Sequence, residues 1–160
     1  TGAALRAAEQ RWWGELVAAT FAAAAAPLPA GAFARLWTHY AGAAAWRAAP
    51  GAAALLDDLR RRGLRTGLVS NFDHRLPAVL AALDLAARFD AIVLPADAGA
   101  AKPDARIFRL ALERLGVAAG EALYVGDDAE DDIAGATAAG LRALDVGTAG
   151  LGGVAAQCGA

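Results

Sequence analysis

Residues 65–71 have the sequence RTGLVSN, a short apolar run that ends in the chain's one serine and one asparagine, Ser70 and Asn71. A run of this length, bounded by polar and turn-forming residues, is typical of a buried strand and too short for a helix. Residues with helical spacing of apolar side chains lie on both sides of it, at Gly51–Arg62 and at Leu76–Ala87. This stretch therefore predicts a strand placed between two helices.

The same alternation continues to the end of the sequence. Further strands are predicted at Ala91–Leu94, Ala122–Val125 and Arg142–Val146, and further helices at Pro103–Leu115 and Ile133–Ala139. Strands separated by helices of this length predict an α/β fold, with a parallel sheet and helices on both faces. We assign this fold to residues 49–160, which end in a Gly/Ala-rich tail around Cys158.

Residues 1–48 have a different pattern and are predicted to be helical throughout. An Ala-rich helix is followed by a break at Pro27-Leu28-Pro29 and by a second helix over Gly31–Trp46. All four tryptophans of the chain fall here. Large aromatic side chains dominate burial between packed helices, so this region is predicted to be a helix pair.

Composition excludes several classes of protein. The chain has 160 residues with fifteen basic and seventeen acidic side chains, giving a net charge of −2 and no basic stripe for nucleic acid or a membrane surface. The apolar run Leu16–Ala26 is too short to span a bilayer. Cys158 is the one cysteine, which excludes disulfide frameworks and cysteine zinc sites and fits a cytoplasmic protein. The oligomeric state cannot be predicted from these features.

Polar residues follow three of the predicted strands, where ligands bind in parallel α/β sheets. Ser70 and Asn71 follow the first strand, and Lys102, the chain's one lysine, follows the second. The third strand is followed by an acidic group, Asp127, Asp128, Asp131 and Asp132. The chain's unique serine, asparagine and lysine are therefore predicted to lie at one edge of the sheet.

These residue types suit an anion held beside a divalent metal ion. The Ser70 hydroxyl and the turn amides at Ser70-Asn71 can donate to phosphate oxygens, and Lys102 adds a compact positive charge. Asp127 and Asp132 offer the hard oxygen ligands that Mg²⁺ prefers. Asp131 or Asp132 could instead cap the following helix, and Asp128 could simply be solvated.

Three segments together resemble the later three motifs of haloacid dehalogenase-like (HAD) hydrolases, in matching order and spacing over Pro50–Val146. The segments are Leu68-Val69-Ser70-Asn71-Phe72-Asp73, then Ala101-Lys102-Pro103-Asp104 with Ile107-Phe108, then Tyr124-Val125-Gly126-Asp127-Asp128 with Asp132-Ile133. The resemblance implies a Rossmann-like core over 49–160, and residues 1–48 resemble the trailing half of the superfamily's C1 cap.

The resemblance also implies roles for the residues at the sheet edge. Ser70, with Asn71, would bind the transferring phosphoryl oxygen, and Lys102 would neutralise the phosphate and the nucleophile. Asp127 would bind Mg²⁺, Asp132 would support the metal or its waters, and Asp128 is a third candidate ligand. The Gly-Asp-Asp form at Gly126 resembles the magnesium-dependent phosphatases of small phosphorylated metabolites more than the metal-free dehalogenases.

One departure from the family pattern concerns the nucleophile. The family begins with a strand ending in Asp-x-Asp, and no such sequence precedes Ser70. Asp73 and Asp97 lie near the expected edge but are poor replacements. In the family that strand lies between the strands predicted at Arg65–Val69 and Ala122–Val125. We therefore expect these two strands to be unpaired, bridged by another segment or collapsed onto each other.

Three hypotheses about function follow. The first is a truncated phosphatase, inactive alone, whose parent protein acts on a small phosphomonoester through an aspartyl-phosphate. The second is a non-catalytic module that binds phosphate and Mg²⁺ or a partner. The third is a 2-haloacid dehalogenase. A response-regulator receiver is excluded, because its acidic pair comes first in the chain. The sequence leaves the substrate open.

Overall fold

The computed structural model describes residues 2–158, and its elements alternate as the sequence predicts. The four strands are β1 (Gly67–Val69), β2 (Ala91–Val93), β3 (Leu123–Gly126) and β4 (Arg142–Asp145). The α-helices are α1 (Gly2–Ala23), α2 (Ala32–Ala41), α3 (Ala52–Arg61), α4 (Leu76–Ala82), α5 (Pro95–Ala98), α6 (Ala105–Leu115), α7 (Gly135–Ala138) and α8 (Val146–Gln157). Short helical turns are η1 (Ala43–Ala45), η2 (Ala86–Arg88), η3 (Ala119–Glu121) and the π-helical η4 (Ala129–Ala134).

The strands pair in parallel, but they form two sheets instead of one. β1 pairs with β2, with Leu68 opposite Ile92, and β3 pairs with β4, with Val125 opposite Leu144. Within residues 2–158 no ladder joins β1 to β3. Parallel pairing is therefore confirmed, and so is the expectation that these two strands make no direct ladder.

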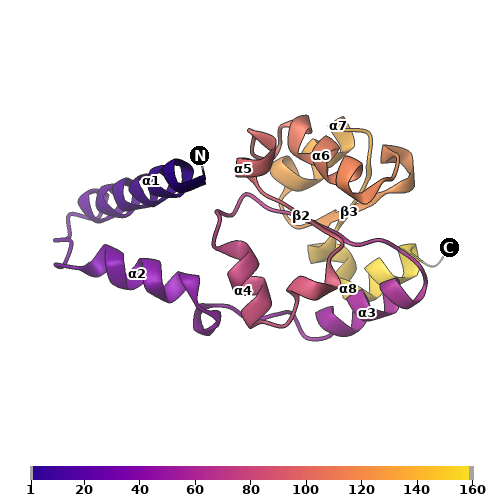
Figure 1. Cartoon of the computed structure of the whole chain (residues 1–160), viewed down its shortest axis with the longest axis horizontal. Helices are drawn as coiled ribbons and strands as arrows, with labels where there is room; N and C mark the ends of the chain where they lie inside the picture. The colour runs from indigo at the N-terminus through magenta and orange to yellow at the C-terminus, as the bar shows by residue number, and fades with distance from the viewer. Residues whose placement is uncertain (1, 159–160) are drawn as a thin grey trace.

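Helices cover the strands from two sides. Figure 1 shows α5, α6 and α7 on one side of the strands and α3, α4 and α8 on the other. The core is centred on Val93, Ile107, Phe108 and Ala136, all of which are buried. Helix α6 supplies two of these residues because its apolar side chains recur on one face. Its first turn is capped by Asp104, whose carboxylate accepts from the Arg106 backbone N–H at 2.9 Å.

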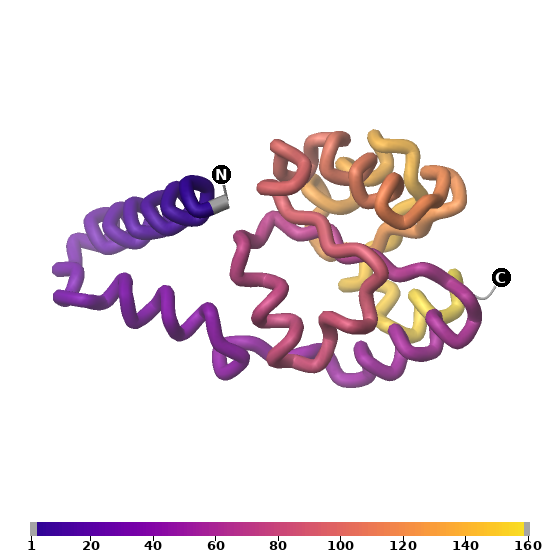
Figure 2. The backbone as a smooth tube through the Cα atoms, viewed as in Figure 1, coloured from indigo at the N-terminus to yellow at the C-terminus, as the bar shows by residue number. Residues whose placement is uncertain are grey.

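Helices α1 and α2 form a hairpin that projects from one end of the molecule (Figures 1 and 2). The break expected at Pro27–Pro29 is confirmed, since it falls between the end of α1 and the start of α2. Phe33 of α2 packs where Gly14 of α1 has no side chain; a Cβ there would lie 3.6 Å from the Phe33 ring. Phe33 also contacts Trp37, with ring centroids 5.8 Å apart.

Two predicted helices are shorter than the sequence pattern indicates, and a third begins earlier. The helix expected over Gly31–Trp46 ends at Ala41, because Gly42 is extended and the Trp46 indole folds back to donate to the Tyr40 carbonyl at 3.1 Å. The helix expected over Leu76–Ala87 ends at Ala82, in a turn where Asp84 has a φ of 56°. The helix expected over Ile133–Ala139 begins as the π-helical turn η4 and continues as α7.

Two helices were not predicted. Helix α5 is a single turn whose backbone is capped by Asp97. Helix α8 lies in the Gly/Ala-rich tail, for which no helix was predicted; it is kinked at Gly150, and its Val154 is buried. Glycine and alanine give little periodic apolar signal, and the helix is stabilised by packing against β3, β4 and α3 and by its N-cap Asp145. None of the helices within residues 2–158 has the length and apolarity that a membrane crossing needs.

Candidate active site

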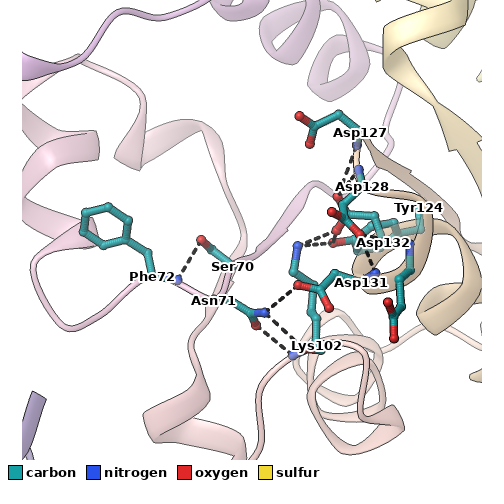
Figure 3. Close-up of polar contacts among 10 residues, drawn as sticks. Ser70, Asn71, Phe72, Lys102, Tyr124, Asp127, Asp128, Asp131 and Asp132 are labelled. Carbon is teal, nitrogen blue, oxygen red and sulfur yellow. Dashed lines mark hydrogen bonds and ion pairs between the residues drawn. The ribbon is translucent and has the colours of Figure 1, made fainter. Parts of the chain in front are cut away.

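The polar residues singled out in the sequence lie at one end of the two sheets. Figure 3 shows Ser70 and Asn71 after β1, Lys102 in the loop after α5, and the acidic residues after β3. Carboxyl ends of parallel strands meet at a common edge, which is why residues about thirty positions apart in the chain come together here.

Lys102, Asp132 and Tyr124 form a compact hydrogen-bonded cluster (Figure 3). The Lys102 ammonium makes an ion pair with Oδ1 of Asp132. The Tyr124 hydroxyl donates to the same oxygen at 2.8 Å and accepts from Lys102 Nζ at 3.3 Å. Only 12% of the Lys102 side chain and 5% of the Asp132 side chain are exposed, so water competes weakly for these bonds.

The second oxygen of Asp132 is occupied by backbone. It accepts from the N–H groups of Asp127 and Asp128, both at 3.1 Å. Burial alone raises the pKa of the Asp132 carboxyl, but the hydrogen bonds from Lys102, the Asp128 backbone and Tyr124 outweigh it and hold that pKa below its ordinary value. Asp132 is therefore an ionised carboxylate whose two oxygens each accept two donors.

Tyr124 is held as a neutral phenol. Burial and then the hydrogen bond to Asp132 raise the pKa of the Tyr124 hydroxyl well above its ordinary value, and the negative charges of Asp131 and Asp127 add to this. The hydroxyl therefore keeps its proton and remains a hydrogen-bond donor to Asp132.

The side chain of Asn71 forms hydrogen bonds with other groups of the protein. Its Oδ1 accepts from the Lys102 backbone N–H at 2.7 Å, and its Nδ2 donates to the Lys102 carbonyl and to Asp131 Oδ2, each at 3.1 Å. The side chain thus joins the end of β1 to the Lys102 loop and to η4. The predicted contact with phosphate is left to the backbone N–H of Asn71.

Ser70 lies beside this cluster without bonding to it (Figure 3). Its backbone N–H donates to the Val93 carbonyl at 3.2 Å, which continues the β1–β2 ladder. Its Oγ accepts from the Phe72 backbone N–H at 3.1 Å. The hydroxyl proton of Ser70 is therefore left to donate to a ligand.

The acidic residues after β3 do not form a metal centre by themselves. Asp128 caps η4, because its carboxylate accepts from the N–H groups of Glu130 and Asp131 at 2.9 and 2.7 Å. From the sequence, Asp131 or Asp132 was a candidate for this capping role. Both oxygens of Asp132 are hydrogen-bonded to protein donors. Of the three predicted metal ligands, Asp127 is therefore the one whose carboxylate accepts no hydrogen bond from residues 2–158. Within the same residues no three acidic, His or Cys side chains are grouped to hold a metal ion.

The two aspartates near this edge are both engaged elsewhere. Asp73 is buried and accepts from Arg75, with Nε 2.8 Å from Oδ1. Asp97 accepts from the Leu94 N–H at 3.0 Å and pairs with Arg114. Neither carboxylate is placed as a nucleophile, in agreement with the sequence analysis.

With this geometry established, the chain can be compared with known proteins. A family model for haloacid dehalogenase-like hydrolases matches residues 1–140. The chain belongs to this family. Membership agrees with the resemblance of its three motifs and with the arrangement of parallel strands and covering helices.

The relatives of this HAD family member are named for different activities. Haloacid dehalogenase-like hydrolase domain-containing protein 3 of Mus musculus is 36% identical over 84% of the chain and 55% of its own length. Phosphoserine phosphatase of Thermus thermophilus is 42% identical over 59% of the chain and 39% of its length. A crystal structure of a dehalogenase matches with a TM-score of 0.66 and 32% identity, over 75% of the chain and 52% of that protein. The chain thus spans just over half the length of the first of these relatives.

Sequence reasoning missed the roles of two residues in this site. Tyr124 is part of a predicted strand and of the third motif but is given no role of its own, although a buried tyrosine usually has a partner for its hydroxyl. Asp131 was given only a capping role, whereas its carboxylate accepts from Asn71. Hydroxyl and amide partners such as these depend on segments far apart in the sequence.

Proposed function

We propose that this chain is the phosphate-binding part of a HAD phosphatase that acts on a small phosphomonoester. The observation that carries the proposal is the Lys102 ammonium, fixed by Asp132 and Tyr124 beside a serine with a free hydroxyl proton. A fixed positive charge and a hydroxyl donor suit phosphoryl oxygens. A relative named phosphoserine phosphatase supports this substrate class.

In the proposed reaction, Lys102 and Ser70 bind and orient the phosphoryl group. The group passes to an aspartate that residues 1–160 do not supply, forming an aspartyl-phosphate and releasing the alcohol. Water then hydrolyses this acyl phosphate, which regenerates the aspartate and releases inorganic phosphate. Residues 1–48 are proposed as half of a cap, and residues 49–160 as a core without its first strand. This division is supported by β1 and β3, which form no ladder with each other.

The proposal also includes a dependence of phosphatase activity on Mg²⁺. Asp127 has the carboxylate left for Mg²⁺, whereas Asp128 and Asp132 are occupied by protein donors. The described residues therefore do not form a complete magnesium site, and we assign no step to the metal.

The test is made first on the 160-residue chain. It should bind Mg²⁺ weakly by isothermal titration calorimetry and hydrolyse an aryl phosphate no faster than buffer, because it lacks a nucleophile. Adding an upstream strand that ends in Asp-x-Asp should restore magnesium-dependent turnover. In that extended protein Asp127→Asn should reduce turnover by weakening metal binding. Strong turnover by the unextended chain would contradict the proposal.

Dehalogenation is the second candidate, favoured by the similarity to a dehalogenase structure. It also forms a covalent intermediate on an aspartate, an alkyl ester in place of the acyl phosphate, but it releases halide and needs no metal. The extended protein should therefore be assayed in parallel for phosphate release and for halide release from a 2-haloacid, with and without Mg²⁺. An extended protein that turns over neither substrate would favour a non-catalytic binding module.

A further inference from the structure

The hydroxyl of Tyr124 does more than complete the packing of β3. The ring of Tyr124 contacts Phe108 edge to face, with centroids 5.2 Å apart, and this contact needs only the ring. Phenylalanine at this position would keep that packing. The hydroxyl, in contrast, lies between Lys102 and Asp132 and bonds to both.

The geometry of an ammonium group gives this hydroxyl a directional effect. Lys102 Nζ has three N–H donors in a fixed, near-tetrahedral arrangement. One is directed to Asp132 and a second to Tyr124. Because these two acceptors also bond to each other at 2.8 Å, they lie on the same side of the ammonium, and the third N–H is directed away from them. No other residue within 2–158 accepts from Lys102 Nζ.

We infer that Tyr124 is a positioning residue, which fixes the rotation of the Lys102 ammonium so that its third N–H is directed at the phosphoryl group. This inference rests on the proposed function for the identity of the anion. It assigns Tyr124 no contact with substrate. Without the hydroxyl, Lys102 keeps its ion pair but can rotate about it, and Asp132 loses one of its four donors.

The chain offers a direct test, because Lys102 is its single lysine. Acylation of Lys102 by a small amine-reactive ester can be followed by mass spectrometry of the peptide that contains it, at low protein concentration. Lys102 Nζ can react with the ester only when it is released from its hydrogen bonds to Asp132 and Tyr124. In Tyr124→Phe we expect Lys102 to be acylated about two- to tenfold faster, the range set by losing one hydrogen bond. Inorganic phosphate should slow acylation, and the concentration that gives half-protection should rise by a similar factor in the variant.

The matched control is Tyr40→Phe. Tyr40 is the chain's other tyrosine, lies on α2 with 45% of its surface exposed, and makes no side-chain hydrogen bond within the described residues. This variant should be acylated at the wild-type rate and protected by the same phosphate concentration.

A second measurement covers the case in which Tyr124→Phe fails to fold. In the Tyr40→Phe background Tyr124 is the one tyrosine left, so growth on 3-fluorotyrosine modifies it alone. Fluorination makes the hydroxyl a stronger donor to Asp132 and a weaker acceptor for Lys102, while the ring keeps its packing. The rate of Lys102 acylation should therefore change.

The outcomes separate the inference from the proposed function. Unchanged Lys102 acylation in both Tyr124→Phe and the fluorinated protein would overturn the positioning role. Faster acylation in Tyr124→Phe without protection by phosphate in either protein would support the positioning role and contradict the phosphate site. Faster acylation together with weaker phosphate protection supports both.

Discussion

Gly126 has no Cβ, and the position of the Asp132 side chain depends on this. A Cβ at this position would overlap the Asp132 side chain, which lies directly over the Gly126 backbone. This close approach lets Asp132 accept from the backbone N–H groups of Asp127 and Asp128. Any side chain here would displace the carboxylate that holds Lys102.

Gly126→Ala should therefore destabilise the chain by about 1–3 kcal/mol, the cost of overpacking a closely packed site. It should also make Lys102 more reactive towards acylation. Urea unfolding measures the first effect and peptide mass spectrometry the second. Gly120→Ala is the control, since a Cβ there meets nothing within 4 Å. Equal unfolding free energies for the two variants would contradict the steric argument.

Asp73 and Arg75 form a buried ion pair at the start of α4. Burial raises the pKa of the Asp73 carboxyl, but hydrogen bonds from the Arg75 side chain and backbone outweigh it, so the pKa is lowered. The Arg75 guanidinium also lies 3.6 Å from the centre of the Trp37 ring and donates to the Trp37 carbonyl. This pair therefore ties the loop after β1 to α2.

Asp73→Asn should lower the free energy of unfolding at neutral pH by about 3–5 kcal/mol, because it leaves a buried guanidinium without its counter-charge. The native pKa is depressed, so this stabilisation is fully present above the unfolded pKa of about 3.9 and is lost as the pH falls through the lower native value. The gap between wild type and variant should shrink below about pH 4 in chemical unfolding. Asp84→Asn, at a side chain that is 94% exposed, should show a small effect at every pH.

At the scale of elements, α1 is linked to the loop after β1 by a hydrogen bond between two side chains. Glu9 of α1 contacts His74 in that loop, four residues after Ser70. Figure 1 shows the N-terminal end of α1 facing the rest of the molecule while the far end of the hairpin projects away. This contact is therefore placed to hold the helical hairpin near the candidate site.

Glu9→Gln should loosen α1 without unfolding the core. The pair is partly exposed, so its loss should cost at most about 1 kcal/mol. Hydrogen exchange followed by mass spectrometry should show faster exchange in peptides from α1 and unchanged exchange in α6. Glu15→Gln on the same helix is the control, since Glu15 makes no ion pair within residues 2–158. The tether is refuted if both variants exchange alike.

At the scale of the whole molecule, the division into two sheets is the main weakness of the fold. β1 and β3 each have a strand on one side only, so backbone groups on their other edges lack ladder partners. None of the residues of β1 or β3 is fully buried, so these edges are accessible to water or to a strand of another molecule.

The isolated chain should therefore self-associate or unfold at low denaturant concentration. Sedimentation velocity at several protein concentrations tests the first outcome, and urea unfolding tests the second. The extended protein proposed above should be monomeric and more stable if its added strand occupies these edges. A stable monomer of the 160-residue chain with one cooperative transition would favour a self-sufficient, non-catalytic domain.

The sequence alone predicted the positions of the strands along the chain, their parallel orientation and the edge at which the polar residues collect, but it predicted one sheet where the described residues form two. These features depend on local information: apolar runs define β1 to β4, and helices between them force parallel connections. The unique Ser70, Asn71 and Lys102 could be placed for the same reason, since each lies next to the end of a predicted element.

Only the tertiary structure decided what these side chains do. Asn71 and Lys102 are 31 positions apart, and Lys102 and Asp132 are 30 apart, so no local pattern reveals that they bond to each other. The sequence could not show that Asp128 caps η4 while Asp132 anchors Lys102, because all the aspartates after β3 are chemically alike. Which carboxylate is buried beside the lysine depends on the path of the backbone, and Gly126 leaves that space to Asp132.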